Sequence, residues 1–225
     1  MFPETALVTG SAGGIGRAIV TALEAEGAAV RGLDLVDGFD VADPLAWADV
    51  EPADLVCLNA GVLAKGDGTV DDYRRILGVN VDGVVFGVQA LVPRMREGSA
   101  FVVTASLAGL IPMESDPLYV LTKHAVVGYA RSLAPLLEPR GIRINLVCPG
   151  IVRTPMTEPA QAKLDEAGFP LLEPEQVAEA VLVAARSEET GQAWVCQPGR
   201  EPLKFRFPGV PGPRVEGAEG MVPQL

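Results

Sequence analysis

Two residues with complementary acid/base chemistry, Tyr119 and Lys123, stand four positions apart in the segment YVLTK. On a helix this spacing places both side chains on one face, one turn apart. A free tyrosine hydroxyl has a pKa of about 10, which is too high for ready proton exchange at neutral pH, and a neighbouring ammonium group lowers that pKa by favouring the phenolate. The pair therefore predicts a general acid/base, although a solvent-exposed helix face with two unrelated polar side chains has the same pattern.

The elements that would position this pair alternate between apolar strand-like and periodic helix-like segments. Strands are predicted at residues 6–10, 29–35, 54–61, 99–106, 142–150 and 192–197. Helices are predicted from a glycine-rich turn to about Glu26, over about 70–95, over about 118–138, and from Pro174 onward. Near-continuous apolar strands that alternate with helices predict an α/β fold, in which a parallel sheet has helices on both faces.

The composition is that of one compact globular domain. The 225 residues are 48% hydrophobic and 21% charged, and this length suits a single domain with a sizeable core. A formal charge of −11 without a cluster of Lys and Arg argues against a nucleic-acid partner. No apolar run approaches the roughly 18 residues that span a membrane, and the start MFPETALVTG lacks the basic region of a signal peptide. We therefore expect a soluble cytoplasmic protein that binds neither nucleic acid nor membrane.

The cysteines and the single histidine predict neither disulfides nor a metal site. Cys57, Cys148 and Cys196 lie far apart, each in an apolar strand-like run, and His124 is the one histidine of the chain. Such cysteines are typical of core thiols in a reducing compartment. His124 adjoins Lys123 but points to another side of the predicted helix, so we expect a structural role for it.

The first predicted strand leads into a glycine-rich turn, TGSAGGIG at residues 9–16. Gly10, Gly14 and Gly16 let the chain turn tightly and let a phosphate approach a helix N-terminus, although the spacing is neither the G-x-G-x-x-G fingerprint nor a P-loop. Asp34 ends the second strand, where a carboxylate accepts hydrogen bonds from an adenosine ribose and repels a 2′-phosphate; a solvated aspartate at a strand end is the alternative. Because the two residues after Asp34 are apolar rather than basic, NAD is favoured over NADP.

With four further motifs in a fixed order, the chain resembles the short-chain dehydrogenase/reductase family. The six motifs are T-G-x-x-x-G-x-G at residues 9–16, N-A-G at 59–61, Asn80 in GVNVDG, Ser106 in TASLAG, Y-x-x-x-K at Tyr119 and Lys123, and P-G-x-x-x-T at 149–154. The resemblance is dense over residues 9–154 and continues more weakly to about Pro198. It implies a single doubly wound Rossmann-type domain over residues 1–198 that binds NAD and holds the active site. A Pro/Gly-rich C-terminal tail is expected over residues 199–225.

The resemblance implies an NAD(H)-dependent oxidoreductase that interconverts a secondary alcohol and a ketone by hydride transfer. By similarity, Tyr119 is the acid/base, Lys123 holds the nicotinamide ribose and lowers the pKa of Tyr119, and Ser106 positions the substrate oxygen. Asn80 would support a water-linked proton path to Lys123. The residues implied to bind NAD are Gly10, Ser11, Gly14, Ile15, Gly16, Asp34, Asp40, Val41, Asn59, Ala60, Gly61, Tyr119, Lys123, Pro149, Gly150, Val152 and Thr154.

Within this set the resemblance places each group at a part of the cofactor. Asn59 and Ala60 are expected on the adenine ribose side, and Val152 and Thr154 beside the nicotinamide carboxamide.

One segment departs from the family pattern. Members have a full helix between the second and third strands, whereas about five residues separate Asp34 from Asp40 and Val41, the expected end of a third strand. The next helix, around 43–50, is expected to be short, and one face of the sheet to be thinner. The adenine contacts implied for Asp40 and Val41 therefore depend on how this shortened segment folds.

Three rival functions share parts of the pattern. A non-catalytic nucleotide-binding sensor predicts loss of Ser106, Tyr119 or Lys123, and all three are present. A dehydratase or epimerase of the extended relatives predicts a longer chain after Thr154. A methyltransferase also uses a glycine-rich turn and an acid, but it has no use for YVLTK and the serine before it.

The segment 153–173 is expected to form a lid over the substrate. Its cations are Arg153 and Lys163, and its apolar side chains, with Met113 outside the segment, are expected to line the cavity: Met156, Leu164, Phe169, Leu171 and Leu172. This composition favours an uncharged or mostly apolar secondary alcohol. By similarity, we also expect a homo-oligomer, a dimer or tetramer, formed through the long helix and the YVLTK helix.

Overall fold

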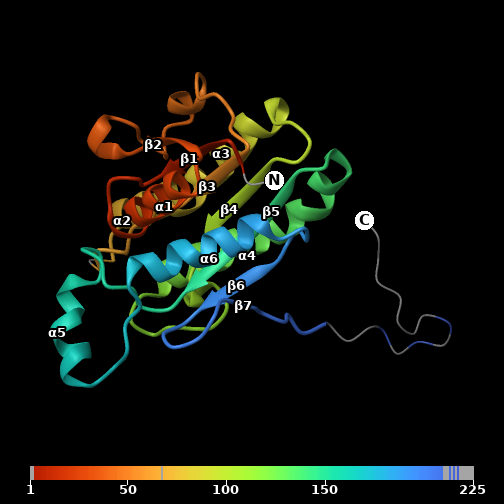
Figure 1. Ribbon diagram of the computed structural model, residues 1–225. Helices are drawn as coiled ribbons and strands as arrows, with labels where there is room; N and C mark the ends of the chain where they lie inside the picture. Colours follow the sequence, from red (N-terminus) through yellow and green to blue (C-terminus); the bar gives the residue numbers. More distant parts are fainter. Residues whose placement is uncertain (1–2, 67, 210–212, 214, 216, 218–225) are drawn as a thin grey trace.

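A seven-stranded sheet organises the part of the chain that the structure describes, residues 3–66, 68–209, 213, 215 and 217. The computed structural model has the strand order β2-β1-β3-β4-β5-β6-β7 (Figure 1). The strands are β1 Thr5–Thr9, β2 Ala29–Leu33, β3 Leu55–Leu58, β4 Ala100–Thr104, β5 Arg143–Pro149, β6 Ala193–Cys196 and β7 Leu203–Lys204. Strands β1 to β6 pair in parallel and β7 pairs antiparallel with β6, so the predicted α/β fold with a mostly parallel sheet is confirmed.

Helices cover both faces of this sheet. They are α1 Gly14–Ala25, α2 Val70–Leu77, α3 Gly83–Leu91, α4 Pro117–Leu137, α5 Glu158–Glu166 and α6 Pro174–Arg186. Helices α1 and α6 pack beside each other on one face, while α3 and α4 pack on the other (Figure 1). α5 projects from the body of the molecule at the lower left of Figure 1.

Strand β1 shows why the strands are apolar along their whole length. Leu7 packs in the same cluster as Val84 of α3, whereas its neighbours Ala6 and Val8 pack with Ile19 of α1. Successive side chains of a strand point to opposite faces of the sheet. A parallel sheet covered on both faces therefore needs apolar residues at every position rather than at alternate ones.

The carboxyl ends of β1, β3, β4 and β5 meet at one edge of the sheet, because these strands are parallel neighbours. The predicted site residues follow these ends: the glycine turn after β1, residues 59–61 after β3, Ser106 after β4 and Gly150 after β5. This edge is where ligands bind in open α/β sheets.

The predicted long helix is continuous from Val70 to Arg94 but changes its winding in the middle. A π-helical segment, Gly78–Asp82, joins α2 to α3 and contains Asn80. Such segments are rare and occur frequently at functional sites. By length and composition this helix resembles a membrane span, yet Val84, Val88 and Leu91 lie in the core, as in a helix that packs on a sheet.

The predicted third strand ending at Asp40 and Val41 is wrong. After β2 the chain forms a 3-10 turn, Leu35–Asp37, and reverses at Gly38, whose φ is 84°. A parallel strand needs a crossover of about a dozen residues or more, and this segment is too short for one. Asp40 is exposed and its side chain accepts a hydrogen bond from the Ala42 N–H at 2.9 Å.

Val41 is instead a core residue. It is buried in the cluster on the α3 side of the sheet, and its carbonyl accepts a hydrogen bond from the indole N–H of Trp47 at 3.0 Å. Trp47 ends a second 3-10 turn, Pro44–Trp47, which is the short helix expected around 43–50.

The C-terminal segment adds a strand that the sequence did not predict. β7 pairs with β6, and after it Phe205 and Phe207 pack edge to face with ring centroids 4.9 Å apart. The Arg131 guanidinium of α4 lies 3.6 Å from the ring centroid of Phe207. The boundary at residue 199 stays a prediction, and most of the predicted tail beyond Gly209 lies outside the described residues.

Candidate active site

The hydroxyl groups of Ser106 and Tyr119 meet at the carboxyl edge of the sheet. Ser106 follows β4 and begins a short 3-10 turn, in which its hydroxyl accepts a hydrogen bond from the Ala108 N–H at 3.1 Å. Tyr119 lies in the first turn of α4, whose N-cap is Asp116. The hydroxyl of Ser106 acts on the pKa of Tyr119, so the strand and the helix bring their two hydroxyls to the same place.

Lys123 lies one helical turn after Tyr119 and is almost completely buried, with 4% of its surface exposed. Its ammonium group donates a hydrogen bond to the carbonyl of Thr104 at 2.9 Å and lies 5.5 Å from the centre of the Tyr119 ring. Burial lowers the pKa of Lys123 to about 8. The predicted placement of Tyr119 and Lys123 on one helix face is therefore confirmed.

The predicted lowering of the pKa of Tyr119 is wrong in this structure. Burial raises that pKa to about 12; the neighbouring hydroxyl of Ser106 opposes the rise, and the negative charge of Asp116 adds to it. The ammonium group of Lys123 is directed at the Thr104 carbonyl, and desolvation of the phenolate is the main cause of the raised pKa.

The side chain of Asn80 forms hydrogen bonds to the loop after β3 rather than to Lys123. Its amide donates to the carbonyl of Val62 at 2.9 Å and to the hydroxyl of Thr122 at 3.0 Å, and its oxygen accepts the Val62 N–H at 2.8 Å. A Cβ on Gly61 would lie 3.5 Å from both the Asn80 oxygen and the Lys123 ammonium. The two polar groups thus face the same glycine, and the water-linked path between them stays a prediction.

The backbone of the glycine turn is closely packed, and the N-terminus of the helix that follows has no side-chain cap. A Cβ on Gly16 would lie 1.9 Å from the carbonyl oxygen of Gly10, which itself has a φ of 66°. Gly13 is the N-cap of α1, which has no side-chain cap and no acidic residue in its first turn. Free N–H groups at a helix N-terminus suit a phosphate, so this turn fits the pyrophosphate of a dinucleotide.

Two further turn residues that the resemblance implies for NAD binding pack against the protein. Ser11 lies over β2, where a Cβ on Gly32 would come within 2.5 Å of its hydroxyl oxygen. Ile15 is half-buried and packs against the core beneath α1.

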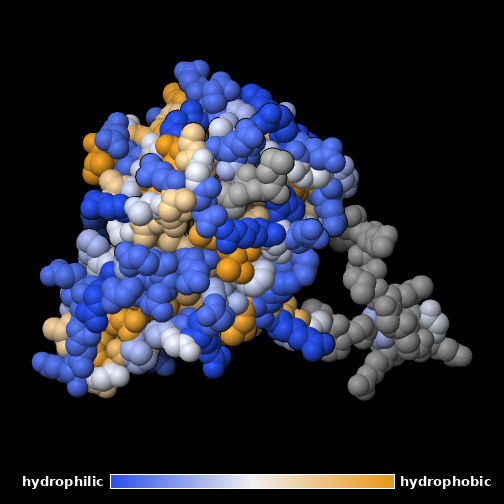
Figure 2. Space-filling view, in the orientation of Figure 1, coloured by the Kyte–Doolittle hydropathy of each residue, from blue (hydrophilic) through white to orange (hydrophobic). Residues whose placement is uncertain are grey.

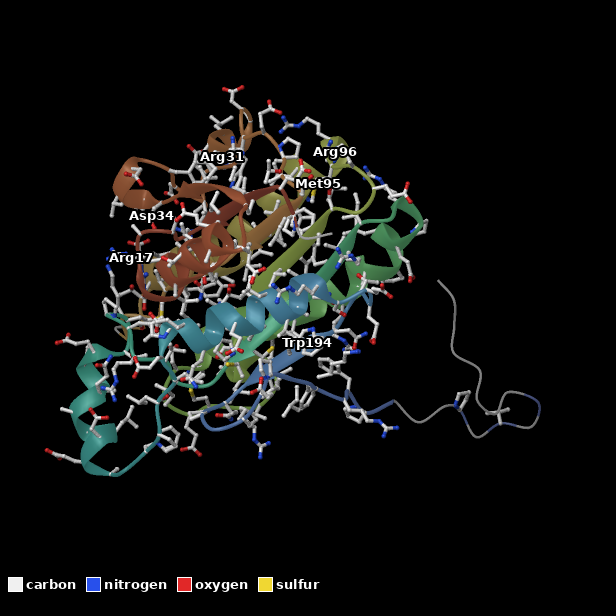
Figure 3. All side chains as sticks on the ribbon, viewed as in Figure 1. Arg17, Arg31, Asp34, Met95, Arg96 and Trp194 are labelled. Atoms are coloured by element: carbon white, nitrogen blue, oxygen red, sulfur yellow. The ribbon has the colours of Figure 1, made fainter. Side chains whose placement is uncertain are left out.

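Asp34 is bound to the glycine turn. One carboxylate oxygen accepts the Ala12 N–H at 2.9 Å and the other accepts the Val36 N–H at 3.2 Å. Arg17 of α1 donates to the carbonyl of the same Ala12 at 2.6 Å, and Figure 3 shows Arg17 and Asp34 on the same side of the molecule. The half-buried carboxylate at the end of β2 therefore stands beside the turn, as predicted.

Asn59 supports the turn from below. Its side-chain amide donates to the carbonyls of Thr9 and Gly10, at 3.1 and 3.5 Å, and its oxygen accepts the hydroxyl of Thr104 at 3.0 Å. The Thr9 hydroxyl in turn accepts the N–H groups of Asn59 and Ala60. The side chain of Asn59 thus ties β1, β3 and β4 together, and contact of Asn59 and Ala60 with a ribose stays a prediction.

The chain after β5 returns to the glycine turn. Gly150 donates to the Cys196 carbonyl at 3.0 Å, and Val152 is buried and pairs with Leu172 in an isolated bridge. A Cβ on Gly14 would lie 2.6 Å from the methyl carbon of Thr154. The P-G-x-x-x-T motif, which starts at Pro149, and the T-G-x-x-x-G-x-G motif are therefore in contact, although residues 9 and 149 are far apart in sequence.

The predicted lid differs in part from expectation. It contains the helix α5, and Met156 and Phe169 are 41% and 48% exposed. Figure 2 shows hydrophobic surface beside α5. The prediction that Leu172 lines the cavity is wrong, because this side chain is fully buried in the core. The Arg153 guanidinium binds Asp165, at 2.8 and 3.1 Å, and also binds Glu173.

The comparison with known proteins decides the family. A family model described as enoyl-(acyl carrier protein) reductase matches residues 39–196. A crystal structure of a short chain dehydrogenase from Burkholderia cenocepacia J2315, in complex with NADP, matches with a TM-score of 0.76 and 28% identity, over 86% of this chain and 96% of that one. The chain belongs to the short-chain dehydrogenase/reductase family. It is an oxidoreductase with a Rossmann-type nucleotide-binding fold, and the family's cofactor is a nicotinamide dinucleotide.

Relatives of this short-chain dehydrogenase/reductase are dehydrogenases that are named after alcohols. The 3-alpha-(or 20-beta)-hydroxysteroid dehydrogenase of Mycobacterium tuberculosis (strain ATCC 25618 / H37Rv) is 35% identical over 190 residues, which is 70% of this chain and 72% of that protein. The cyclohexanol dehydrogenase of Acinetobacter sp. (strain SE19) is 31% identical over 79% of this chain and 86% of that protein.

Sequence reasoning missed four polar residues of this short-chain dehydrogenase/reductase that hold the site. Arg17 binds the glycine turn, and Asp72, Arg75 and Asp116 bind the loop after β3. The Asp116-Pro117 pair, at the N-cap and first position of α4, is a recognisable cap signal. The second hydrogen bond of Asp116, from the N–H of Ala64 that lies 52 positions earlier, has no signal in the sequence.

Proposed function

We propose that the protein is an NAD-dependent oxidoreductase that interconverts a secondary alcohol and a ketone. The observation that supports this most is the buried ammonium group of Lys123, 5.5 Å from the ring centre of Tyr119, with the hydroxyl of Ser106 beside the same tyrosine. A non-catalytic sensor would have no need for these three groups together. The named activities of the steroid and cyclohexanol relatives point to the same reaction class.

Each of the three side chains has a separate task in this proposal. Ser106 hydrogen-bonds the substrate oxygen and orients it. Tyr119, whose pKa of about 12 keeps it protonated at neutral pH, donates its proton to a ketone oxygen and takes the proton back from an alcohol. Lys123 provides a positive charge that stabilises the phenolate during this exchange. The nicotinamide, when bound, supplies the hydride chemistry.

The choice of NAD over NADP rests on Asp34. Its carboxylate stands beside the glycine turn at the end of β2, where it accepts ribose hydroxyls and repels a 2′-phosphate. The neighbouring Arg17 is bound to the Ala12 carbonyl. The neighbour from Burkholderia cenocepacia holds NADP, so a cofactor test is the first one to make.

A fluorescence titration with NADH and with NADPH tests the cofactor. We expect the wild-type protein to bind NADH more tightly than NADPH, and Asp34→Ser to reduce this preference because the repulsive charge is gone. Asp37→Ser, at an exposed position in the turn after β2, is the matched control and should leave the preference unchanged. Binding of neither cofactor by the wild type would refute the proposal.

For the substrate we propose an uncharged, mostly apolar secondary alcohol. Arg153 is paired with Asp165 and Glu173, and Met156 and Phe169 present apolar surface near the predicted lid. With NAD as cofactor, cyclic secondary alcohols should be oxidised faster than hydroxy acids of similar size. A panel in which only carboxylates or phosphates react would overturn this part.

The wider setting is also proposed from the sequence. We propose one catalytic domain over residues 1–198, a cytoplasmic location, no nucleic-acid or membrane partner, and a homo-oligomeric assembly. The acidic charge of −11 supports the absence of nucleic acid, because phosphate binding needs basic side chains.

A further inference from the structure

The loop of residues 62–66, which follows the Asn59-Ala60-Gly61 motif, has its backbone held by side chains at every residue. The helix from Val70 to Arg94 supplies three of the four holding side chains: Asn80 binds Val62, Arg75 donates to the Leu63 carbonyl at 2.6 Å, and Asp72 accepts the Lys65 and Gly66 N–H groups at 2.6 and 3.3 Å. Asp72 is itself buried and paired with Arg75 at 2.7 Å. Backbone groups with fixed partners resist displacement, so this loop is a firm support.

Asp116 is the fourth holding side chain, and it comes from the catalytic helix. One carboxylate oxygen accepts the N–H of Ala64 in the loop at 3.0 Å. The other accepts the backbone N–H of Tyr119 at 2.9 Å, which is the bond of an N-cap. A single half-buried carboxylate therefore joins the loop to the residue whose hydroxyl meets Ser106.

We infer that Asp116 is a positioning residue for the reaction, which fixes the start of α4, and with it the hydroxyl of Tyr119, against the loop of residues 62–66. This inference rests on the proposed function, because it assigns Asp116 its effect through the acid/base role of Tyr119. An aspartate suits the task because two separate donors need two acceptor oxygens on one short side chain. Serine could cap the helix but has no second oxygen for Ala64.

The charge of Asp116 has a second effect on the same hydroxyl. The groups that face Tyr119 are Lys123 on its own helix, Ser106 after β4, Cys148 of β5 and Asp116. On α2, which packs against α4, Asp72 and Arg75 form an ion pair. Burial is the main reason for the raised pKa of Tyr119, and the negative charge of Asp116 adds to it. Removal of that charge should therefore lower the pKa of Tyr119.

Three variants separate position from charge. Asp116→Asn and Asp116→Ser remove the charge and one of the two acceptors, whereas Asp116→Glu keeps the charge and moves it by one methylene. We expect all three to lower kcat for alcohol oxidation about 10–100-fold, as small misplacements of a catalytic group do, while NADH affinity stays near the wild-type value. In Asp116→Asn and Asp116→Ser, the fall of kcat at low pH should also move to lower pH, because the pKa of Tyr119 is lower. In Asp116→Glu this fall should stay closer to its wild-type position.

The control is Asp43→Asn, which changes another N-cap aspartate, bonded to the Leu45 N–H at 2.9 Å and exposed on the turn Pro44–Trp47. It should leave kcat and the pH limb unchanged. Hydrogen exchange gives a readout that needs no turnover: the amide of Ala64 should exchange faster in Asp116→Ser and as in the wild type in Asp43→Asn.

The inference is overturned if the Asp116 variants keep the wild-type kcat, pH limb and Ala64 protection. Failure of the proposed function has a different signature, since the wild type itself would then bind neither cofactor or oxidise no alcohol. In that case, an unchanged hydrogen-exchange rate of the Ala64 amide in Asp116→Ser would still show that Asp116 does not hold the loop against the helix.

Discussion

Lys123 has its charge at a position that is nearly closed to solvent. In the unfolded chain its amine keeps a proton up to an ordinary pKa of 10.5, whereas in the folded protein burial lowers the pKa to about 8. Between these pH values the unfolded state binds more protons, so the free energy of unfolding rises with pH. Above pH 10 the raised pKa of Tyr119 acts in the opposite direction, because the folded state then keeps a proton that the unfolded state releases.

We therefore expect Lys123→Met to be more stable than the wild type at pH 7 and inactive. Methionine removes a desolvated charge at similar volume, and the stability increase of the wild type between pH 8 and pH 10 should disappear with it. Thermal unfolding at a series of pH values measures both effects. Lys163→Met in the exposed helix α5 is the control and should retain the wild-type pH profile. A Lys123→Met protein that is less stable at pH 7 would contradict the argument.

At the hydroxyl of Tyr119 we expect a loss of chemistry without a loss of binding. Tyr119→Phe keeps the ring and removes the proton donor, so turnover should fall about 10²–10⁴-fold, the usual contribution of a positioned acid/base. NADH titration should give the wild-type affinity. Tyr129→Phe on the same helix is the matched control, and its turnover should be unchanged. Retained turnover in Tyr119→Phe would mean that another group moves the proton.

The residues that the sequence could identify are those whose partners lie close by or in a known motif. Tyr119 and Lys123 are four positions apart, and their common face follows from helix geometry alone. The loop contacts of Asp116 and Arg75 could not be identified, because they are made to backbone atoms, which every residue has. The direction of the pKa shift of Tyr119 was predicted wrongly, because the burial of its hydroxyl depends on residues from several elements that surround it.

Two elements far apart in sequence meet where the glycine turn contacts the segment after β5. Gly14 begins α1, and a Cβ there would lie 2.6 Å from the methyl carbon and 3.0 Å from the Cβ of Thr154. The space between them is therefore too small for a side chain. Any substituent at Gly14 must push this segment away from the turn.

From this contact we predict that Gly14→Ala destabilises the protein by about 1–3 kcal/mol, as overpacking usually does, and weakens NADH binding. Adding Thr154→Ser removes the methyl group, keeps the hydroxyl and should restore part of both losses. Adding Thr154→Val keeps the methyl group and should restore neither. Thermal unfolding and NADH titration of these double variants give the result. Equal recovery by serine and valine would show that the clash is not the cause.

The elements that were predictable are those with a strong local pattern. The strands of the parallel sheet are buried on both faces, so they appear as unbroken apolar runs such as Leu55–Leu58. The third strand was wrongly expected from the family pattern, although the segment between β2 and Val41 is too short for a crossover. The π-helical turn at Asn80 and the polar helix α5 were not predicted, because neither changes the hydrophobic periodicity of the sequence.

For the whole molecule, exposed apolar side chains on α2 and α4 support the proposed homo-oligomer. Leu121 and Leu136 of α4 are 46% and 69% exposed, and Val70 of α2 is 61% exposed. We expect sedimentation at micromolar concentration to give a dimer or tetramer, and Leu121→Glu with Leu136→Glu to give a smaller species. The control is Leu45→Glu, which changes an 80% exposed leucine on the 3-10 turn Pro44–Trp47, away from α2 and α4. It should not change the assembly. A monomeric wild type would end this proposal.

The three cysteines can report which part of the protein unfolds first. All are buried as free thiols, and burial raises their pKa values to about 12 for Cys57 and Cys148 and about 11 for Cys196. A reagent that attacks thiolates must therefore wait until the surrounding structure separates. Cys57 lies in the interior strand β3 and Cys196 in β6, next to the terminal strand β7. The order in which they are labelled would distinguish release of the C-terminal edge from disruption of the sheet, without any probe added to the chain.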